Sequence, residues 1–269
     1  MPTVSPKRAF TLVEVTPDEK VYELCIKLKD VPGAIAKTAK LLSDNGVNIK
    51  TGSLFYGPKS RKFGFWTSFV DVSKAKSGVE KLDQELRKLP AVLDVKFEEP
   101  KPAPYEIMHF PIMHGDLRAV VMSTNLFGSM LSGIERILAP SGFAAVLYDS
   151  GKKAGEHYTK YFRDKYGLEK REELIQTLMQ AWKAIGWGLV TVNEINAECL
   201  PATVIVEENF EAIVWKKKPY KVCHWSRGFI AGYFGAVFGK PVEVTEVKCL
   251  AAGDEHCEFE VKPERKQEK

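Results

Sequence analysis

The chain has 269 residues and is 45% hydrophobic, which is enough to bury sizeable cores and is typical of about two domains. Its 39 basic and 35 acidic residues leave a formal charge of +4, too small a surplus to indicate direct binding to nucleic acid or to an anionic membrane. The longest nearly apolar run, residues 228–239, is too short to cross a hydrocarbon layer of about 30 Å as a helix, and Glu14 interrupts the only stretch resembling a signal peptide. We therefore expect a cytoplasmic protein without a membrane partner.

Hydrophobic periodicity in the first hundred residues predicts a βαββαβ order, the ferredoxin-like arrangement of an α+β fold. Residues 1 to about 18 contain three prolines and are expected to form a tail or one edge strand. The elements expected after them are a strand at 21–29, a helix at 34–45, a hairpin of strands at 47–55 and 62–72, a helix at 77–89 and a strand at 92–98.

The turn between the first strand and the first helix is a candidate ligand site. Gly33 would let a ligand approach the backbone, and a helix beginning there presents free N–H groups to a carboxylate. The alternative is that the turn only connects the strand to the helix. The motif Asp30-Val31-Pro32-Gly33-Ala34-Ile35, followed by Asn45-Gly46-Val47-Asn48-Ile49, resembles the ACT domain over residues 20–98. That resemblance implies a regulatory module that pairs with itself and holds an amino acid, with candidate ligand residues Asp30, Pro32, Gly33, Ala34, Ile35 and Asn48.

Three prolines between positions 100 and 104 predict an extended connector at residues 99–106, followed by a second domain at 107–262 and a charged tail at 263–269. Helices are expected at 126–138, from about 155 to 166, at 171–185 and at 223–238. A strand or helix edge is expected at 117–122, strands at 143–148, 188–196 and 202–207, and a final hairpin at 242–250 and 255–261.

Three of the five cysteines lie in the last fifth of the chain, a pattern more typical of a metal site than of a disulfide framework. A hairpin turn centred on Gly253 places Cys249 opposite Cys257, with Cβ atoms about 5 Å apart. Cys223 begins a glycine-rich helix, whose dipole favours a thiolate. The residue types leave the fourth ligand open among Glu246, His224, His256 and Glu260.

The order Cys223, Glu246, Cys249, Cys257, interspersed with glycines such as Gly228, Gly232 and Gly239, resembles the V4R or vinyl-reductase domain. The motifs Tyr148-Asp149-Ser150-Gly151, Gly186-Trp187-Gly188 and Asn209-Phe210-Glu211-Ala212 extend the resemblance over residues 115–262. It implies a zinc ion held by Cys223, Glu246, Cys249 and Cys257, and a cavity for a small hydrophobic or aromatic molecule. Segments containing Phe210, Trp215, Tyr233 and Phe234 would build that cavity, but the histidine and tryptophan that hold phenol in sensors of this family have no match here.

Three thiolates and one carboxylate would close a tetrahedral zinc site and leave no position for a reacting water, so we expect a structural metal. Glu246 and Cys249 are three residues apart and would point to opposite faces of a regular strand, which requires a bulge near Val247. The alternatives are a Cys249–Cys257 disulfide or ordinary free thiols. Cys25 and Cys199 stand alone in apolar strands and are expected to be buried thiols.

Both resemblances imply regulatory modules, and no catalytic constellation or dinucleotide-binding motif stands out. The sequence therefore favours a ligand-sensing homodimer without catalytic residues, and any role in transcription would act through a partner protein. Two other functions stay open: a reductase or its accessory factor, which would carry a redox cofactor, and an interaction scaffold, which would bind no small molecule.

Overall fold

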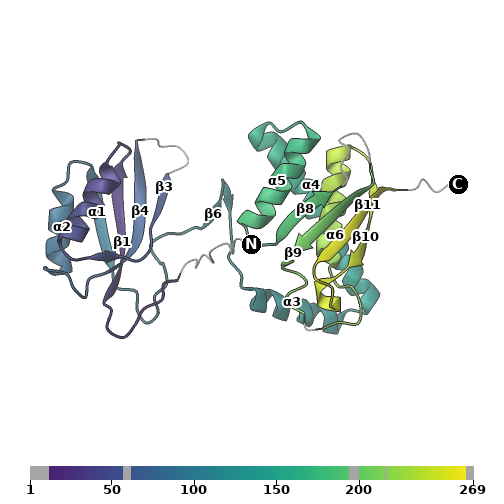
Figure 1. Ribbon diagram of the computed structural model, residues 1–269, viewed down its shortest axis with the longest axis horizontal. Coiled ribbons are helices and arrows are strands. Elements are labelled where there is room, and N and C mark those ends of the chain that lie inside the picture. Colours follow the sequence, from purple (N-terminus) through teal and green to yellow (C-terminus); the bar gives the residue numbers. More distant parts are fainter. Residues whose placement is uncertain (1–11, 57–61, 194–199, 216, 265–269) are drawn as a thin grey trace. The chain divides into compact units, whose positions relative to one another are not determined.

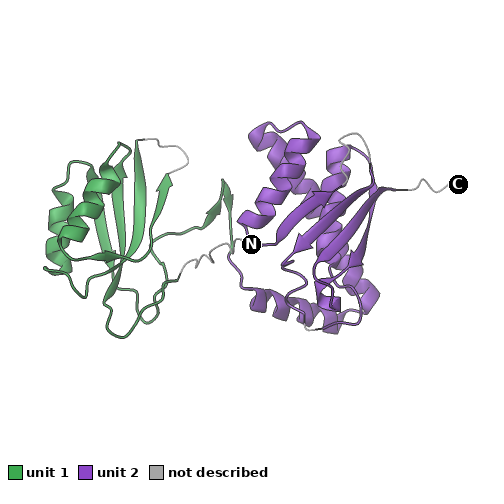
Figure 2. Ribbon diagram, in the orientation of Figure 1, with its two compact units in different colours: residues 1–120 green, residues 121–269 purple. Residues whose placement is uncertain are grey.

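The computed structural model describes residues 12–56, 62–193, 200–215 and 217–264 (Figure 1). Its contacts divide the chain into two compact units, residues 1–120 and 121–269 (Figure 2). The sequence predicts domain boundaries at residues 98 and 107. They stay a prediction, because a division by contacts does not show which segments fold by themselves. None of the described helices is long and apolar enough to span a membrane.

The first unit is built on one antiparallel sheet. Its elements are β1 (Val21–Lys29), α1 (Ala34–Asp44), β2 (Asn48–Ile49), β3 (Ser53–Tyr56), β4 (Phe63–Asp71), α2 (Val79–Arg87) and β5 (Val92–Glu98). The strand order is β2-β4-β1-β5, with β3 also paired to β4. This order confirms the α+β, ferredoxin-like βαββαβ fold.

One face of this sheet is covered by the two helices. Every second residue of β1, from Leu24 to Leu28, packs into a core with Leu42 of α1 and Leu82 and Leu86 of α2. The strand predicted at 47–55 is interrupted, because Lys50 N donates to Phe69 O and the Thr51 hydroxyl accepts from Phe69 N instead of continuing the ladder. The predicted hairpin turn lies partly outside the described residues.

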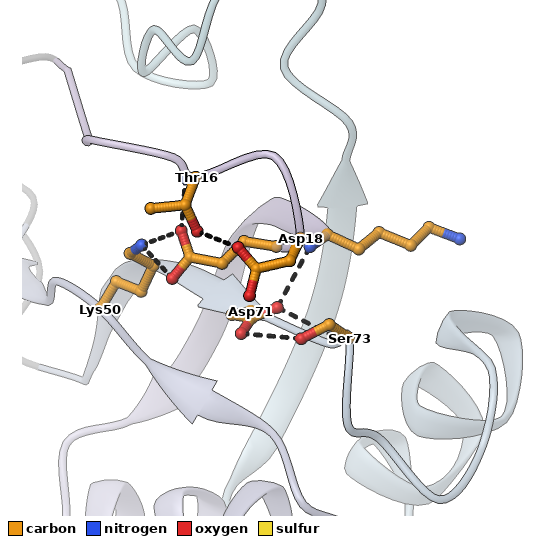
Figure 3. A network of polar contacts seen from close by, with 7 residues as sticks. Thr16, Asp18, Lys50, Asp71 and Ser73 are labelled. Atoms are coloured by element: carbon orange, nitrogen blue, oxygen red, sulfur yellow. Dashed lines mark hydrogen bonds and ion pairs between the residues drawn. The ribbon is translucent and has the colours of Figure 1, made fainter.

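The segment before β1 lies on the opposite face of the sheet. Val13 packs there on Val21 and Phe69. Figure 3 shows the polar network that fixes this segment: Glu19 forms an ion pair with Lys50, and the Asp71 carboxylate accepts from Lys20 N at 3.2 Å. The described part of the predicted tail is therefore ordered against the domain, and its Leu12 makes an isolated bridge with Tyr105.

A second segment, residues 104–111, also crosses this face; we call it the crossing segment. The buried Glu23 carboxylate accepts the backbone N–H groups of Ile107 and Met108 at 2.9 and 3.2 Å. His109 Nε2 lies 3.7 Å from Cys25 Sγ, and hydrogen bonds to Cys25 and then to Glu106 raise the pKa of His109 to about 10. The prediction that Cys25 is a lone buried thiol is wrong, because it is half-buried and has this histidine as a neighbour; Cys199 lies outside the described residues.

A short hairpin of β6 (Met113–His114) and β7 (Leu117–Arg118) ends the first unit. The second unit contains α3 (Thr124–Ile137), α4 (Pro140–Tyr166), α5 (Arg171–Ala184), β8 (Leu189–Asn193), β9 (Ala202–Glu207), α6 (His224–Phe238), β10 (Val242–Lys248), the 3₁₀ turn Leu250–Ala252 and β11 (Cys257–Pro263). Its sheet is antiparallel in the order β10-β11-β9-β8, and one core joins the sheet to α5 and α6.

The strand predicted at 143–148 is wrong, because these residues form the first turns of α4. Pro140 begins this helix instead of only ending the previous one, and the buried positions Phe143, Leu147, Gly151 and Gly155 repeat every four residues. A six-residue apolar run does not by itself distinguish a strand from a buried helix.

Glycines bring α4 and α6 into backbone contact. A Cβ atom added at Gly232 would lie 1.9 Å from the carbonyl oxygen of Lys152, and one at Gly228 would lie 2.1 Å from that of Tyr148. Gly151 and Gly155 present the matching surface on α4. The glycines of α6 thus allow α4 to pack closely against it.

Candidate functional site

The candidate site joins the start of α6 to the final hairpin. Cys223 is the residue before α6, Glu246 lies in β10, Cys249 follows β10, and Cys257 begins β11. Cys223 Sγ is 3.8 Å from Cys249 Sγ and 3.6 Å from Cys257 Sγ, and all three thiols are free and fully buried. The ligand atoms of the four residues all lie within 4.8 Å of one another.

A bulge aims the two β10 side chains at the same point. Glu246 pairs with Phe259 but Lys248 pairs with Glu258, so the register shifts by one residue at Val247. The shift turns the chain so that Glu246 and Cys249 reach one cluster, as predicted. The last pair of the ladder, Lys248 with Glu258, has the register expected for a turn centred on Gly253, whose φ of 108° favours glycine.

The hairpin turn is fixed by short hydrogen bonds. Cys249 N donates to the Asp254 carboxylate at 2.7 Å, and Leu250 N donates to Cys257 Sγ at 3.4 Å. The first bond fixes the backbone at Cys249, and the second is accepted by the sulfur of Cys257. Backbone N–H donation to a ligating sulfur is the kind of support that tunes metal sites.

The geometry distinguishes among the four candidates for the fourth ligand. Glu246 is 7% exposed and one carboxylate oxygen, Oε2, accepts from Cys223 N at 3.1 Å. His256 pairs instead with Glu258, and Glu260 with Lys262. His224 stacks edge-on near Phe143, with ring centroids 6.0 Å apart. The structure therefore brings Glu246 to the three cysteines; that the four ligate a metal stays a proposal.

The burial and the charges of the cluster would suit a bound cation. The other Glu246 oxygen, Oε1, is buried and finds no hydrogen-bond partner in the described part of the chain. Burial, and then the neighbouring Cys249 thiolate, raises the pKa of Glu246 to about 9. Hydrogen bonds from Cys223 and Cys257 lower the pKa of Cys249. A divalent cation would favour the ionised form of Glu246, compensate its charge together with that of the Cys249 thiolate, and contact the unpaired carboxylate oxygen.

Glu211, which was not among the site residues predicted from the sequence, holds the start of α6 in place. Its fully buried carboxylate accepts from Trp225 N at 2.9 Å and Ser226 N at 2.7 Å, so it caps the helix that carries Cys223. Asn209 accepts from Glu211 N and from the Ser226 hydroxyl, which completes the network. The signal available in the sequence was an acidic residue directly before the apolar residues 212–215.

The candidate ligand residues of the first unit lie around an open pocket of about 160 Å³. Four of the six predicted residues, Asp30, Gly33, Ala34 and Ile35, line it, and the Tyr56 hydroxyl reaches Asp30 at 3.2 Å. Pro32 and Asn48 are not among its lining residues, and Asn48 lies in β2 opposite Asp71. The role of all six stays a prediction.

The sequence profile of the V4R domain family matches residues 202–263, which contain all four residues of the cluster. The C-terminal unit contains a V4R domain. Two uncharacterized proteins of Methanocaldococcus jannaschii resemble the chain, each at 25% identity. One match covers 53% of this chain and 76% of the relative, and the other covers 45% and 75%.

The V4R domain is also similar in fold to a solved sensory domain. The crystal structure of the phenol-responsive sensory domain of the transcription activator PoxR with phenol matches at 20% identity and a TM-score of 0.51, covering 57% of this chain and 81% of that one. The first unit matches the ACT domain from GTP pyrophosphokinase of Chlorobium tepidum at 18% identity and a TM-score of 0.24, covering 30% and 99%. The strand order shows the ferredoxin-like arrangement of the first unit, which we call the ACT-like unit after its sequence resemblance.

Proposed function

We propose that the chain is a ligand-sensing regulatory protein whose V4R domain binds a small aromatic molecule and whose cysteine cluster holds a structural zinc ion. The observation that carries the proposal is an aromatic cluster at the start of the helix that Cys223 begins, in which Trp182 and Phe229 are buried and the other members are half-buried. Its members are Tyr158, Trp182, Trp187, Phe210, Trp225 and Phe229. The shared fold with a phenol-responsive sensory domain supports the same class of ligand.

The aromatic cluster contains a donor that lacks an acceptor. Trp182 is 2% exposed, its ring centroid lies 5.5 Å from that of Phe229, and its Nε1–H is paired with no described protein group. An unpaired buried donor costs about 1–3 kcal/mol. An aromatic ligand carrying one oxygen would remove that cost, whereas a pure hydrocarbon would not. We therefore propose phenol-like compounds as the ligand class.

Three of the four aromatic residues whose segments the sequence predicts to build a cavity divide into two groups. Phe210 stacks on Trp187 with ring centroids 5.3 Å apart and so belongs to the cluster. Tyr233 donates its hydroxyl to Leu174 O at 2.6 Å, and Phe234 stacks on Phe238. These last contacts are those of core residues, so we do not include Tyr233 and Phe234 in the proposed ligand site.

The test compares phenol with toluene, which lacks the oxygen. Phenol should raise the melting temperature of the full chain more than toluene at equal concentration, because only phenol can accept from Trp182. Trp182→Phe should remove this preference while keeping the ring, and Trp66→Phe in the first unit should keep it. Equal shifts for the two compounds in the wild type, or no shift with either, would contradict the proposed ligand class.

Zinc fits the cysteine cluster because a tetrahedral site with Zn–S bonds of about 2.3 Å separates its sulfurs by about 3.8 Å. The observed Sγ distances of 3.6 and 3.8 Å are close to that value. The four ligands would leave no open position, so the ion would tie α6 to the hairpin and not take part in a reaction. A reducing cytoplasm, which keeps thiols available, suits this site.

We propose the pocket of the ACT-like unit as a site for an amino acid. Gly33 precedes α1 with a φ of 82°, and among the described residues no side chain caps the helix. Backbone N–H groups at this helix start can bind the ligand's carboxylate. An amino-acid panel should include one that raises the melting temperature of the wild type but not of Ile35→Glu, whose charge would repel the carboxylate. Lys81→Glu, on the exposed surface of α2, is the matched control.

A further inference from the structure

A second group of potential metal ligands lies in the first unit, outside the pocket and the cysteine cluster. Donor atoms of Glu23, Glu106 and His109 all lie within 4.8 Å of one another. Glu23 comes from β1, whereas Glu106 and His109 come from the crossing segment. Two segments 84 residues apart in the chain thus place two carboxylates and one imidazole together.

The environment of these groups favours a cation. Glu23 is fully buried, and burial is the main cause that raises its pKa. Glu106 adds a second negative charge, and its Oε1 lies 3.4 Å from His109 Nδ1. Two carboxylates therefore share one imidazole. Buried carboxylates are normally compensated by a cationic partner or by a metal ion.

The imidazole has the support that metal-binding histidines usually have. With Nδ1 facing Glu106, the other ring nitrogen, Nε2, is the one closer to the Thr67 hydroxyl, which lies 3.0 Å from Nε2 and 3.4 Å from Nδ1. Cys25 Sγ lies on that side too, at 3.7 Å from Nε2. A ligating histidine commonly donates its other N–H to a nearby acceptor, which fixes the orientation of the ring. Thr67 and Cys25 would orient His109, and neither would touch the ion.

We propose that Glu23, Glu106 and His109 form a second metal site, which takes a divalent first-row transition ion such as zinc through two carboxylates and one imidazole. Zinc separates oxygen and nitrogen ligands by about 3.3 Å, close to the distance between Glu106 and His109. Three protein ligands leave a position open to solvent or to a small anion, unlike the closed cysteine cluster. The ion would replace the proton on His109 and fasten the crossing segment to the sheet.

The test measures zinc bound per chain in the full-length protein after chelation, zinc titration and gel filtration. Glu106→Gln and His109→Ala should each bind one equivalent less than the wild type. Glu80→Gln and His114→Ala, matched changes elsewhere in the first unit, should bind as much as the wild type. Cys25→Ser should also keep the wild-type amount, because the thiol is not a ligand. Excess magnesium should not displace the ion, since magnesium prefers oxygen ligands.

The difference of one equivalent is measured against the wild type, so it does not depend on whether the cysteine cluster is filled. If Glu106→Gln and His109→Ala both keep the wild-type amount of zinc, the second site does not exist. If Cys25→Ser loses the ion, the proposed ligand set is wrong. Circular dichroism of each variant separates loss of the ion from loss of the fold, and Glu106, which is half-buried, is the milder change.

Discussion

At the scale of single residues, the cysteine cluster depends on one carboxylate with two oxygens in different roles. Glu246 Oε2 accepts from Cys223 N, whereas Oε1 is buried without a partner among the described residues. A buried carboxylate that lacks a partner is costly unless a cation compensates it. Glu246 should therefore lower the free energy of unfolding of the metal-free protein and raise that of the metal-bound protein.

Glu246→Gln separates these two effects. We expect zinc affinity to fall at least about tenfold, because the amide cannot replace the anionic ligand. The free energy of unfolding of the metal-free protein should stay the same or rise, because a buried carboxyl group is gone. Chelator competition and urea unfolding measure the two quantities. Glu243→Gln, exposed on the same strand, is the control, and a Cys249→Ser variant that kept its zinc would disprove the site.

Glu211 predicts a pH dependence of stability in the metal-free chain. Burial raises its pKa to about 7 from 4.5, although the backbone N–H groups of Ser226 and Trp225 lower it in part. An acid whose pKa is raised on folding binds its proton more tightly in the folded state. Its contribution to stability is therefore complete below pH 4.5 and is lost as the pH rises through about 7.

The difference between wild type and Glu211→Gln should show this loss. Between about pH 4 and pH 8 the wild type should lose about 3 kcal/mol relative to the variant, because the neutral amide does not titrate. Urea unfolding in the presence of a chelator measures it. A pH-independent difference would mean that Glu211 keeps its ordinary pKa in the fold.

At the scale of elements, the contact between α4 and α6 depends on glycines at which a Cβ has no space. Gly232→Ala would place a methyl group 1.9 Å from Lys152 O, which is backbone and cannot rotate away. We expect a loss of about 2 kcal/mol or more in the free energy of unfolding, despite the higher helix propensity of alanine. Since α6 carries Cys223, zinc affinity should fall as well.

The control for this change lies one turn further along the same helix. A Cβ at Gly235 would meet its nearest neighbour, Lys240 O, at 3.5 Å, an ordinary contact. Gly235→Ala should therefore be neutral or stabilise the protein by up to about 1 kcal/mol. Equal losses in the free energy of unfolding for Gly232→Ala and Gly235→Ala would show that the close contact between α4 and α6 does not cause the destabilisation.

At the scale of the whole molecule, the buried residues form separate cores within the two units. One core contains Leu24 and Leu82 in the ACT-like unit, and another contains Trp182 and Phe229 in the V4R unit. Each unit thus has the buried apolar surface that a folding unit requires. We expect calorimetry of the full chain to resolve two transitions.

Two substitutions assign these transitions. Leu82→Ala removes most of a fully buried side chain of α2 and should lower the free energy of unfolding of the first unit by about 2–5 kcal/mol, so that one transition moves to lower temperature. Gly232→Ala should move the other transition to lower temperature. If either variant lowers both transitions equally, the units do not unfold independently. Light scattering tests the predicted homodimer on the same samples, since a dimer has twice the 30.2 kDa of one chain.

The sequence by itself determined the features that depend on residues close together in the chain. Alternation and turn residues gave the βαββαβ order, and the symmetry of a hairpin about Gly253 gave the register of the final hairpin. The spacing of Glu246 and Cys249 required the bulge at Val247, because side chains on a strand alternate between faces. These are consequences of local backbone geometry.

Only the tertiary structure decided what depends on distant segments. The apolar run that begins at Phe143 is helical, and its Phe143 and Leu147 share a core with Leu131 of α3, whereas local pattern could not choose between the two conformations. Among the four candidates for the fourth position, Glu246 reaches the cluster because the packing of β10 on α6 brings it to Cys223 N. The meeting of Glu23 with His109 joins residues that no periodicity relates. Such contacts result from the packing of whole elements, which local sequence does not encode.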